Sequence, residues 1–250
     1  MPRFKADLHI HNASDPREIE YGPFGLVSPY TIIDKAFEKG YEILSFTNHN
    51  NLHSDSNITN YAHSKGILLI PGVELNIEKK HVLLYNIKDY MEIDSFESLR
   101  NYRDESSLIV APHPFYPTGS CLRDALIEYI DCFDAVEYSH FYTRFWNPNK
   151  KAVCISDHFK KTIIGSSDTH CIAQFGSTYS LIDATELSIP AIIHAVKNGN
   201  AEVVSEPLSV LRIAWIMSVL GMRFVHSLVT GRRFIRNQND HTKNTSKSLR

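Results

Sequence analysis

Side chains of the kinds that bind metal ions stand at or just beyond the ends of short apolar segments throughout this chain. Ligands from many separate segments can converge only if the fold brings the ends of those segments together. A barrel of parallel strands does this, because its loops all leave from one rim. The pattern therefore predicts the multinuclear metal centre of a hydrolase, with nine candidate ligands: His9, His11, Asp15, His49, Glu74, His81, His113, Asp168 and His170.

Apolar runs of strand length alternate with helical patterns, which favours parallel strands in an α/β barrel or a doubly wound sheet. An open sheet gathers its binding groups at one switch point, whereas here five separate strand ends carry polar groups, so a closed or nearly closed barrel is favoured. The expected strands are residues 4–10, 42–46, 67–70, 81–85, 108–111, 135–138, 162–164 and 178–182. The expected helices are residues 28–40 and 188–199, each opened by a serine near a proline and closed by a glycine, and residues 57–65, 95–105, 122–129 and 149–160.

The 250 residues, 43% of them hydrophobic and 22% charged, are enough for one large globular domain. The net charge of −2 is unevenly distributed. From Arg223 onward seven Lys and Arg stand against one Asp, a balance of +6, so residues 1–222 carry −8. An acidic body with a basic end fits metal binding better than bulk nucleic-acid binding, which usually needs a basic face.

The four cysteines, at positions 121, 132, 154 and 171, show neither C-x-x-C pairs nor the spacing of a disulfide framework. A zinc knuckle and a disulfide-stapled scaffold are therefore not expected. The first residues lead directly into a strand, without the apolar stretch of a signal peptide. We expect a cytoplasmic protein.

The spacing of His9 and His11 places both side chains on one face of a strand, where they can hold the same ion, and Asp168 and His170 repeat this spacing. Imidazoles and carboxylates without thiolate favour Zn, Mn or Fe. Six other histidines fall in helical or loop segments, where we expect structural or surface roles: His53, His63, His158, His194, His226 and His241.

Several of these segments form motifs in a definite order. They are Asp7-Leu8-His9-Ile10-His11-Asn12-Ala13-Ser14-Asp15, Thr47-Asn48-His49-Asn50, Pro71-Gly72-Val73-Glu74, the later His81, Ala111-Pro112-His113-Pro114 and Gly165-Ser166-Ser167-Asp168-Thr169-His170. In this order they resemble the PHP (polymerase and histidinol phosphatase) superfamily, approximately from residue 4 to residue 183. The resemblance implies an α/β fold, a distorted (β/α)7 barrel, here with a C-terminal helical extension.

The resemblance also implies up to three divalent ions, Mn, Zn or Fe, at the C-terminal rim of the barrel. The first ion would be held by His9, His11, Glu74 and Asp168. Glu74 would bridge to a second ion, held by His81 and His113. The third would be held by Asp15, His49 and His170.

The chain departs from the family pattern in two places. Asn48 replaces the aspartate that usually precedes the turn histidine. An aspartate there would orient a histidine by accepting its second N–H, and an amide brings no charge, so we expect weaker binding of the third ion. Residues Pro16 to Val27 form a longer link than usual, which is either a lid or substrate loop or a surface insertion.

Clustered divalent ions make hydroxide available near neutral pH and clamp the oxygens of a phosphate, so phosphoester hydrolysis is the expected reaction, with Asp168 at its centre. An anionic substrate also needs a cation nearby. Arg144, beyond the strand 135–138, is the first candidate, with a role as a surface arginine on a loop as the alternative. Arg17, close to Asp15, is the second candidate. His140, just past the same strand, is expected to protonate a leaving group or bind phosphate, or else to be structural.

Residues 208–234 form an apolar segment with arginines at 212, 223, 232 and 233. Its uncharged stretch, Ile213 to Met222, is too short to span a bilayer, which takes about 20 residues. We expect a helix packed on the barrel or on a dimer partner; the alternative is a peripheral membrane contact through a basic amphipathic helix. The expected organisation is a PHP domain at 1–206, this amphipathic helix at 207–236 and a disordered polar tail at 237–250.

The resulting hypothesis is a metal-dependent phosphoesterase that acts on a small phosphorylated molecule, a nucleotide or a short oligonucleotide end through a metal-activated hydroxide. Two alternatives stay open. A metal-dependent amidohydrolase also uses H-x-H on a barrel strand, but commonly carries a bridging lysine where this chain has Glu74. A non-catalytic, metal-stabilised binding module is the other; the complete ligand set counts against it, and Asn48 counts modestly for it.

Overall fold

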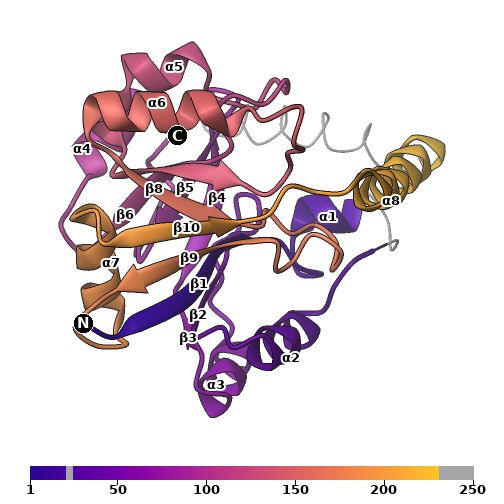
Figure 1. The fold of residues 1–250 in the computed structure, drawn as a ribbon, viewed down its shortest axis with the longest axis horizontal. Coiled ribbons are helices and arrows are strands. Elements are labelled where there is room, and N and C mark those ends of the chain that lie inside the picture. The colour runs from indigo at the N-terminus through magenta and orange to yellow at the C-terminus, as the bar shows by residue number, and fades with distance from the viewer. Residues whose placement is uncertain (21–24, 231–250) are drawn as a thin grey trace, which may run out of the picture.

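A computed structural model describes residues 1–20 and 25–230, and its strands form two five-stranded sheets (Figure 1). The first sheet has the order β10-β9-β1-β2-β3, with bounds β1 Arg3–Ile10, β2 Ile43–Phe46, β3 Leu68–Leu69, β9 Thr178–Asp183 and β10 Ala201–Ser205. The second has the order β4-β5-β6-β7-β8, with bounds β4 Gly72–Ile77, β5 Lys80–Tyr85, β6 Leu108–Ala111, β7 Ala135–Ser139 and β8 Thr162–Ser166.

The strand directions are mixed, and the predicted seven-stranded barrel is not confirmed. Strands β1, β2 and β3 are parallel, as are β6, β7 and β8, whereas β5 is antiparallel to both its neighbours and β9 to both of its own. The physical reason is clear at β4 and β5, because the two-residue turn Glu78-Lys79, with φ of 48° and 68°, can only join antiparallel strands. No closed barrel is found among the described residues, although the bridges Ile10–Thr169 and His49–Glu74 connect the two sheets.

The strands lie close to where the sequence predicts them, with two additions. Strands β4 and β10 were not expected. The apolar run at 67–70 had indicated that Glu74 lies just beyond a strand. Glu74 instead lies inside β4.

The helices follow the capping signals of the sequence. The Ser28 hydroxyl accepts a hydrogen bond from the backbone N–H of Tyr30, and the Ser188 hydroxyl accepts one from Ala191. One helix was not expected, α1, which occupies the first part of the long link after Asp15. The helices are α1 Pro16–Glu20, α2 Pro29–Glu38, α3 Ser56–Ser64, α4 Phe96–Tyr102, α5 Asp124–Glu128, α6 Asn149–Phe159, α7 Ile189–Lys197 and α8 Val210–Val229, with a 3₁₀ turn at Ile130–Cys132.

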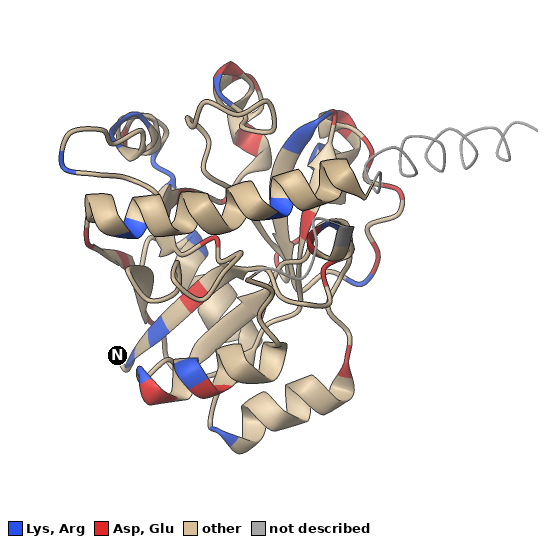
Figure 2. Ribbon diagram, turned by 90° about the vertical axis from the view of Figure 1, so that its right-hand side faces the viewer, with Lys and Arg blue, Asp and Glu red and all other residues tan. Residues whose placement is uncertain are grey.

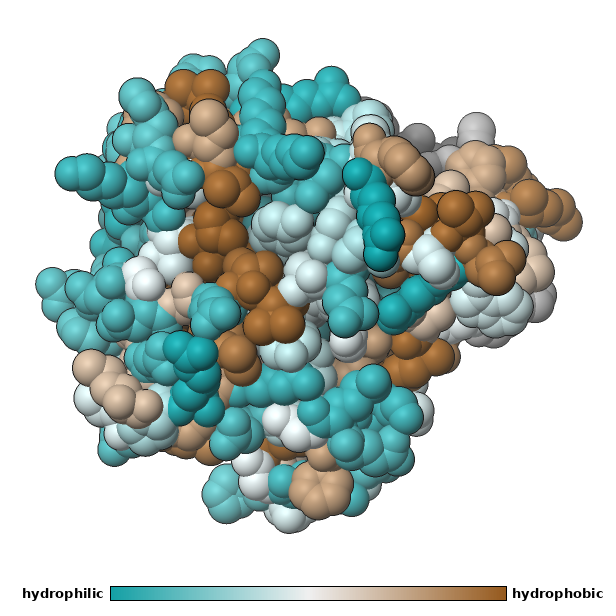
Figure 3. Space-filling view, in the orientation of Figure 1, coloured by the Kyte–Doolittle hydropathy of each residue, from teal (hydrophilic) through white to brown (hydrophobic). Residues whose placement is uncertain are grey.

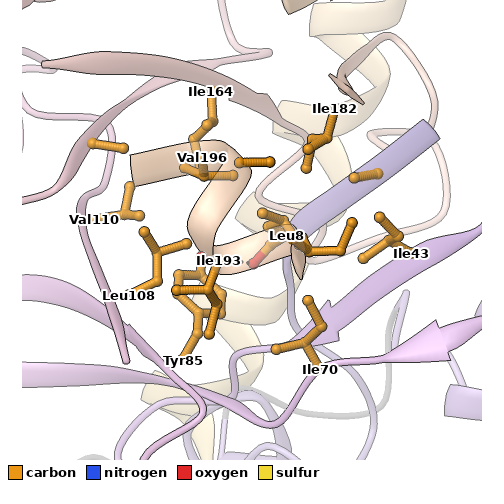
Figure 4. Close-up of a cluster of buried hydrophobic side chains, with 14 of the residues drawn as sticks. Leu8, Ile43, Ile70, Tyr85, Leu108, Val110, Ile164, Ile182, Ile193 and Val196 are labelled. Atoms are coloured by element: carbon orange, nitrogen blue, oxygen red, sulfur yellow. Dashed lines mark hydrogen bonds between the residues drawn. The ribbon is translucent and has the colours of Figure 1, made fainter. Parts of the chain in front are cut away.

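Apolar side chains from both sheets meet around α7, beside the N-terminal end of β1. Figure 4 shows Leu8 of β1 and Val110 of β6 packed near Ile193 and Val196 of this helix. All four are buried. This cluster closes the interior at one end, while α1 and α8 lie beside the opposite end of β1 (Figure 1).

Helix α8 packs on the body of the protein, as one of the sequence-based alternatives predicts. Ile216 and Val219 are buried beside Cys171 and Leu208. The predicted helix extends to residue 236 and the predicted disordered tail covers 237–250; of these, residues 231–250 lie outside the described residues.

Candidate metal centre

All nine predicted ligands lie together at the end of the sheets opposite α7. Each candidate ligand offers one nitrogen or oxygen atom, and the residues form overlapping groups of three. Within each group, the three offered atoms lie within 4.8 Å of one another. These groups are His9–His113–Asp168, His9–His11–Glu74, His11–Asp15–His49, His11–Asp168–His170 and His49–Glu74–His81. They share members, so the residues form one continuous cluster.

Glu74 lies at the centre of this cluster. Its Oε1 is 2.6 Å from Nδ1 of His81 and 3.3 Å from Nε2 of His113, and its Oε2 is 3.0 Å from Nε2 of His49 and 3.4 Å from Nε2 of His11. A carboxylate whose two oxygens each face a different set of imidazoles has the geometry of a bridge between two ions.

Asp168 lies close to a second set of imidazoles. Its Oδ1 lies 3.3 Å from Nε2 of His9, 3.5 Å from Nε2 of His11 and 3.1 Å from Nε2 of His170. The Nε2 atoms of His9 and His11 are themselves only 3.2 Å apart, so these two side chains can reach the same ion.

The topology explains why residues from different positions in their strands meet. His11 and His49 follow the parallel strands β1 and β2, and a break in the β1–β2 register between Asp7 and Ile10 redirects the side chains there. His81 instead stands near the start of β5. Because β5 runs antiparallel to β6, its first residues lie at the same rim as the last residues of β6.

Two of the candidate ligands have strained backbones. Asp168 has a φ of 46° and His113 a φ of 30°, in the left-handed region that L-residues rarely adopt. Such conformations persist where the surrounding structure fixes them, and they are concentrated at functional sites.

Glu137, which the sequence analysis did not single out, contacts two of the candidate ligands through its carboxylate. Its Oε1 lies 2.7 Å from Nδ1 of His9, and its Oε2 accepts a hydrogen bond from the backbone N–H of His113 at 2.6 Å. A carboxylate behind a ligating histidine fixes the orientation of the imidazole and raises its basicity. One sign of this role was present in the sequence, a single acidic residue inside the apolar strand Ala135–Ser139. The side chain of Glu137 is fully buried.

The contacts of Asp15 add to its predicted role as a ligand, and those of Asn48 correct a prediction. Asp15 Oδ2 lies 2.8 Å from Nδ1 of both His11 and His49, while its Oδ1 accepts backbone hydrogen bonds from the start of α1. Asp15 therefore orients two imidazoles and caps a helix. The prediction that Asn48 stands behind a ligand is wrong: its side chain hydrogen-bonds Asn12.

Glu18, in the unexpected helix α1, connects the cluster to α8. Its carboxylate lies 3.0 Å from Nδ1 of His170 and forms an ion pair with Arg223, which is only 2% exposed. Arg223 also donates hydrogen bonds to the backbone oxygens of Glu18 and His170, at 2.9 and 3.2 Å. The link 16–27 thus contributes to the site.

The protonation states fit metal binding. Burial alone would raise the pKa of Glu74 and of Asp168, but the surrounding imidazoles outweigh it and hold the pKa of both carboxyls well below the usual range. Burial lowers the pKa of His81 to about 4, which leaves this imidazole neutral at neutral pH. Burial also acts to lower the pKa of His170, yet Glu18 and Asp168 raise it to about 10. A divalent ion would replace such a proton as the counter-charge of the buried carboxylates.

A cavity of about 400 Å³ opens onto the cluster. Arg17 lines it, with Nη1 3.2 Å from Nε2 of His81, and His140 lines it as well. Arg144 is exposed on the loop after β7 and is not part of the described lining. The structure therefore brings the second candidate cation to the site and leaves the first outside.

His140 has a defined proton position. The amide oxygen of Gln174 accepts the backbone N–H groups of His170 and Cys171, so its Nε2 amide group must face His140, 3.3 Å from the imidazole Nε2. Because burial lowers the pKa of His140 to about 4, the imidazole is neutral and carries its proton on Nδ1. That N–H has no hydrogen-bond partner among the described residues.

Comparison with known proteins finds one family match over part of the chain and several similar folds. A family model described as PHP-associated matches residues 146–201. A two-domain protein from Bacteroides vulgatus, which contains a predicted PHP-like metal-dependent phosphoesterase, has a similar structure, with a TM-score of 0.61 and 22% identity over 82% of this chain and 65% of that chain. The present chain is therefore similar to PHP proteins in sequence over residues 146–201 and in fold over most of its length. It spans less than two thirds of that two-domain chain.

Two further proteins are similar to this chain. An uncharacterized protein of Methanocaldococcus jannaschii is 25% identical over 146 residues, which are 56% of this chain and 84% of that protein. An amidohydrolase from Chromobacterium violaceum, with bound sulfate, shares the fold at a TM-score of 0.52 and 14% identity, over 79% of this chain and 97% of that one. The fold is thus shared by proteins that are named for different activities.

Proposed function

We propose that this protein is a metal-dependent phosphoesterase that hydrolyses a small phosphorylated molecule or a nucleotide. The observation that carries the proposal is the convergence of six histidines and three carboxylates in one cluster, with Glu74 between two sets of imidazoles. Six of these nine residues line the cavity. The donors are nitrogen and oxygen atoms, which suit Mn, Zn or Fe, and the number of donors is enough for up to three ions. Divalent ions held there would supply a water acidic enough to attack at neutral pH and a counter-charge for the phosphate.

The residues of the chain have separable roles in this proposal. Glu74 and Asp168 hold the ions together with the imidazoles around them. Arg17, on the cavity wall, binds a phosphate oxygen. His140 offers the N–H of Nδ1 to a substrate oxygen, since this N–H is otherwise unpaired among the described residues. Arg144 has no role here, because it lies outside the cavity lining.

The cavity limits the size of the substrate. A volume of about 400 Å³ lies at the small end of the range for ligand sites and accommodates one small phosphoester or one nucleotide unit. An oligonucleotide could only place its terminal residue there. We therefore favour a small phosphorylated molecule or nucleotide over internal cleavage of a nucleic acid.

The amidohydrolase alternative remains the second candidate, since the Chromobacterium violaceum amidohydrolase shares the fold. The bridging position counts against it, because this chain has a carboxylate, Glu74, at the centre of the cluster. Asn48 gives the non-catalytic alternative less support than the sequence suggested, because its side chain pairs with Asn12.

The test is an activity screen of purified protein with its metal content measured. The substrates are a phosphomonoester, a phosphodiester, a nucleotide bisphosphate and an N-acyl amide. We expect turnover of at least one phosphoester, loss of turnover after chelation and recovery after Mn²⁺, Zn²⁺ or Fe²⁺ is added back. Turnover of the amide alone, or of no substrate by the metal-loaded protein, would overturn the proposal.

A further inference from the structure

Helix α8 turns its two charged residues inward, together with Ile216 and Val219, and leaves other apolar residues exposed. A helix on the surface of a globular protein normally turns charged residues outward and apolar residues inward. In α8 the charged residues are Arg212 and Arg223, and both face the body of the protein: Arg212 donates a hydrogen bond to the backbone oxygen of Ala173 at 2.7 Å, and Arg223 pairs with Glu18. Figure 2 shows the helix across the face turned to the viewer, tan except for two blue turns.

The outward face of α8 is continuous and apolar. Its residues follow one another at spacings of three, four or seven, which places them on one stripe of a helix. Leu211 is 83% exposed and Val229 81% exposed, at the two ends of the stripe. In Figure 3 apolar residues are gathered at the right-hand edge, where α8 lies. The outer stripe is Leu211, Trp215, Met222, Val225 and Val229.

We propose that this outer stripe docks the protein on the surface of an anionic lipid bilayer. The argument for this occupant is charge complementarity. Directly after α8, residues 231–250 contain six Lys and Arg and one Asp, and three of the six are Arg232, Arg233 and Arg236. An apolar helix face followed by a basic cluster matches the two attractions that an anionic bilayer offers, its apolar interior and its charged headgroups.

A second copy of the chain fits this surface less well. Helix α8 contains no Asp or Glu, so the helix of a second copy would offer no opposite charge to the basic residues that follow in the sequence. A lipid surface supplies that opposite charge.

Docking leaves α8 on the surface of the bilayer and does not carry it across. The helix has the length and composition of a membrane-crossing helix. Its two arginines, however, are bound to the body, and Arg223 is the partner of Glu18, which holds His170. Withdrawing α8 into a bilayer would break these contacts and leave Glu18 buried without its cation.

The orientation places the candidate metal centre beside the lipid. Met217, Leu220 and Phe224 of the same helix line the cavity over the ligand cluster. The docked protein therefore holds its cavity next to the headgroups. This proposal concerns binding and does not depend on the catalytic one.

The experiment uses the full chain carrying Trp146→Phe, which leaves Trp215 as its one tryptophan. The probes are vesicles of phosphatidylcholine alone and vesicles that also contain phosphatidylglycerol. We expect co-flotation and a blue shift of Trp215 emission with the anionic vesicles only. Replacing Arg232, Arg233 and Arg236 by Gln should weaken binding by about a hundredfold.

Variants of the stripe provide the matched test. Leu211→Gln and Val225→Gln should each weaken binding about tenfold, and Met91→Gln, which changes an exposed residue far from α8 in the sequence, should leave it unchanged. Absence of binding to either vesicle would overturn the proposal. So would a concentration-dependent dimer that Leu211→Gln dissociates, or a protein that alkaline carbonate cannot extract from the vesicles.

Discussion

At the end of the sheets beside α7, apolar side chains fill the interior, whereas at the opposite end, beside α1 and α8, imidazoles and carboxylates fill it. The apolar end gains free energy from burial and needs nothing further. The polar end buries ionised groups, which is unfavourable unless each has a partner. The difference teaches that one end stabilises the fold, while the other gathers ionised groups whose charges the proposed cations would balance.

The largest effect should come from removing two ligands at the polar end. His9→Ala with His11→Ala takes away the imidazoles whose Nε2 atoms lie 3.2 Å apart. We expect metal content to fall and phosphoester turnover to drop to the level of the chelated protein, while circular dichroism shows an intact fold. His63→Ala, an exposed histidine on α3, is the control. Normal turnover in the double variant would show that the polar end is not the reaction centre.

The matching change at the apolar end is Ile193→Ala in α7. Ile193 is 1% exposed and packs in the cluster of Figure 4, so its truncation should lower the free energy of unfolding by about 2–5 kcal/mol. Chemical denaturation measures this change. Metal content should be that of the unaltered protein; a variant that loses its metal while remaining folded would erase the distinction between the two ends.

The next largest effect should come from Glu137, whose carboxylate faces His9. Glu137→Gln keeps the shape but removes the charge that faces Nδ1 of His9, so metal affinity should fall by about 10–100-fold. Titration of the apoprotein with metal measures it, and excess metal should restore turnover. Glu105→Gln, at an exposed position, serves as the control. Unchanged affinity in Glu137→Gln would mean that its contacts serve folding only.

The smallest effect should separate the two candidate cations. Arg17→Ala removes a guanidinium from the cavity wall and should raise KM by about tenfold with little change in kcat. Arg144→Ala, outside the cavity lining, should change neither. A larger KM effect from Arg144→Ala than from Arg17→Ala would reverse the assignment made from the structure.

The sequence predicted which chelating side chains meet better than it predicted the scaffold that brings them together. His9, Glu74, His113 and Asp168 could be found because chelating side chains beside apolar runs have a local pattern. Strand direction could not be found in this way, because a run such as 81–85 has the same apolar composition whether it pairs parallel or antiparallel. The sequence marked His81 as a ligand, but only the antiparallel hairpin of β4 and β5 explains its position.

The residues behind the ligands were missed for a different reason. Glu18 and Arg223 are 205 positions apart, and their pairing depends on where α8 packs. Each alone looks like an ordinary helical charge. Glu137 gave a weak signal, an acid inside an apolar strand, which the sequence analysis did not use.

The central claim is that cations occupy the polar end around Glu74. The most direct measurement is anomalous X-ray scattering from crystals of the protein grown with Mn²⁺, recorded above and below the manganese absorption edge. The account predicts peaks between the Glu74 carboxylate and the imidazoles of His49 and His81, and between Asp168 and those of His9 and His11. A map without anomalous peaks in this cluster, from protein that still hydrolyses a phosphoester, would contradict it.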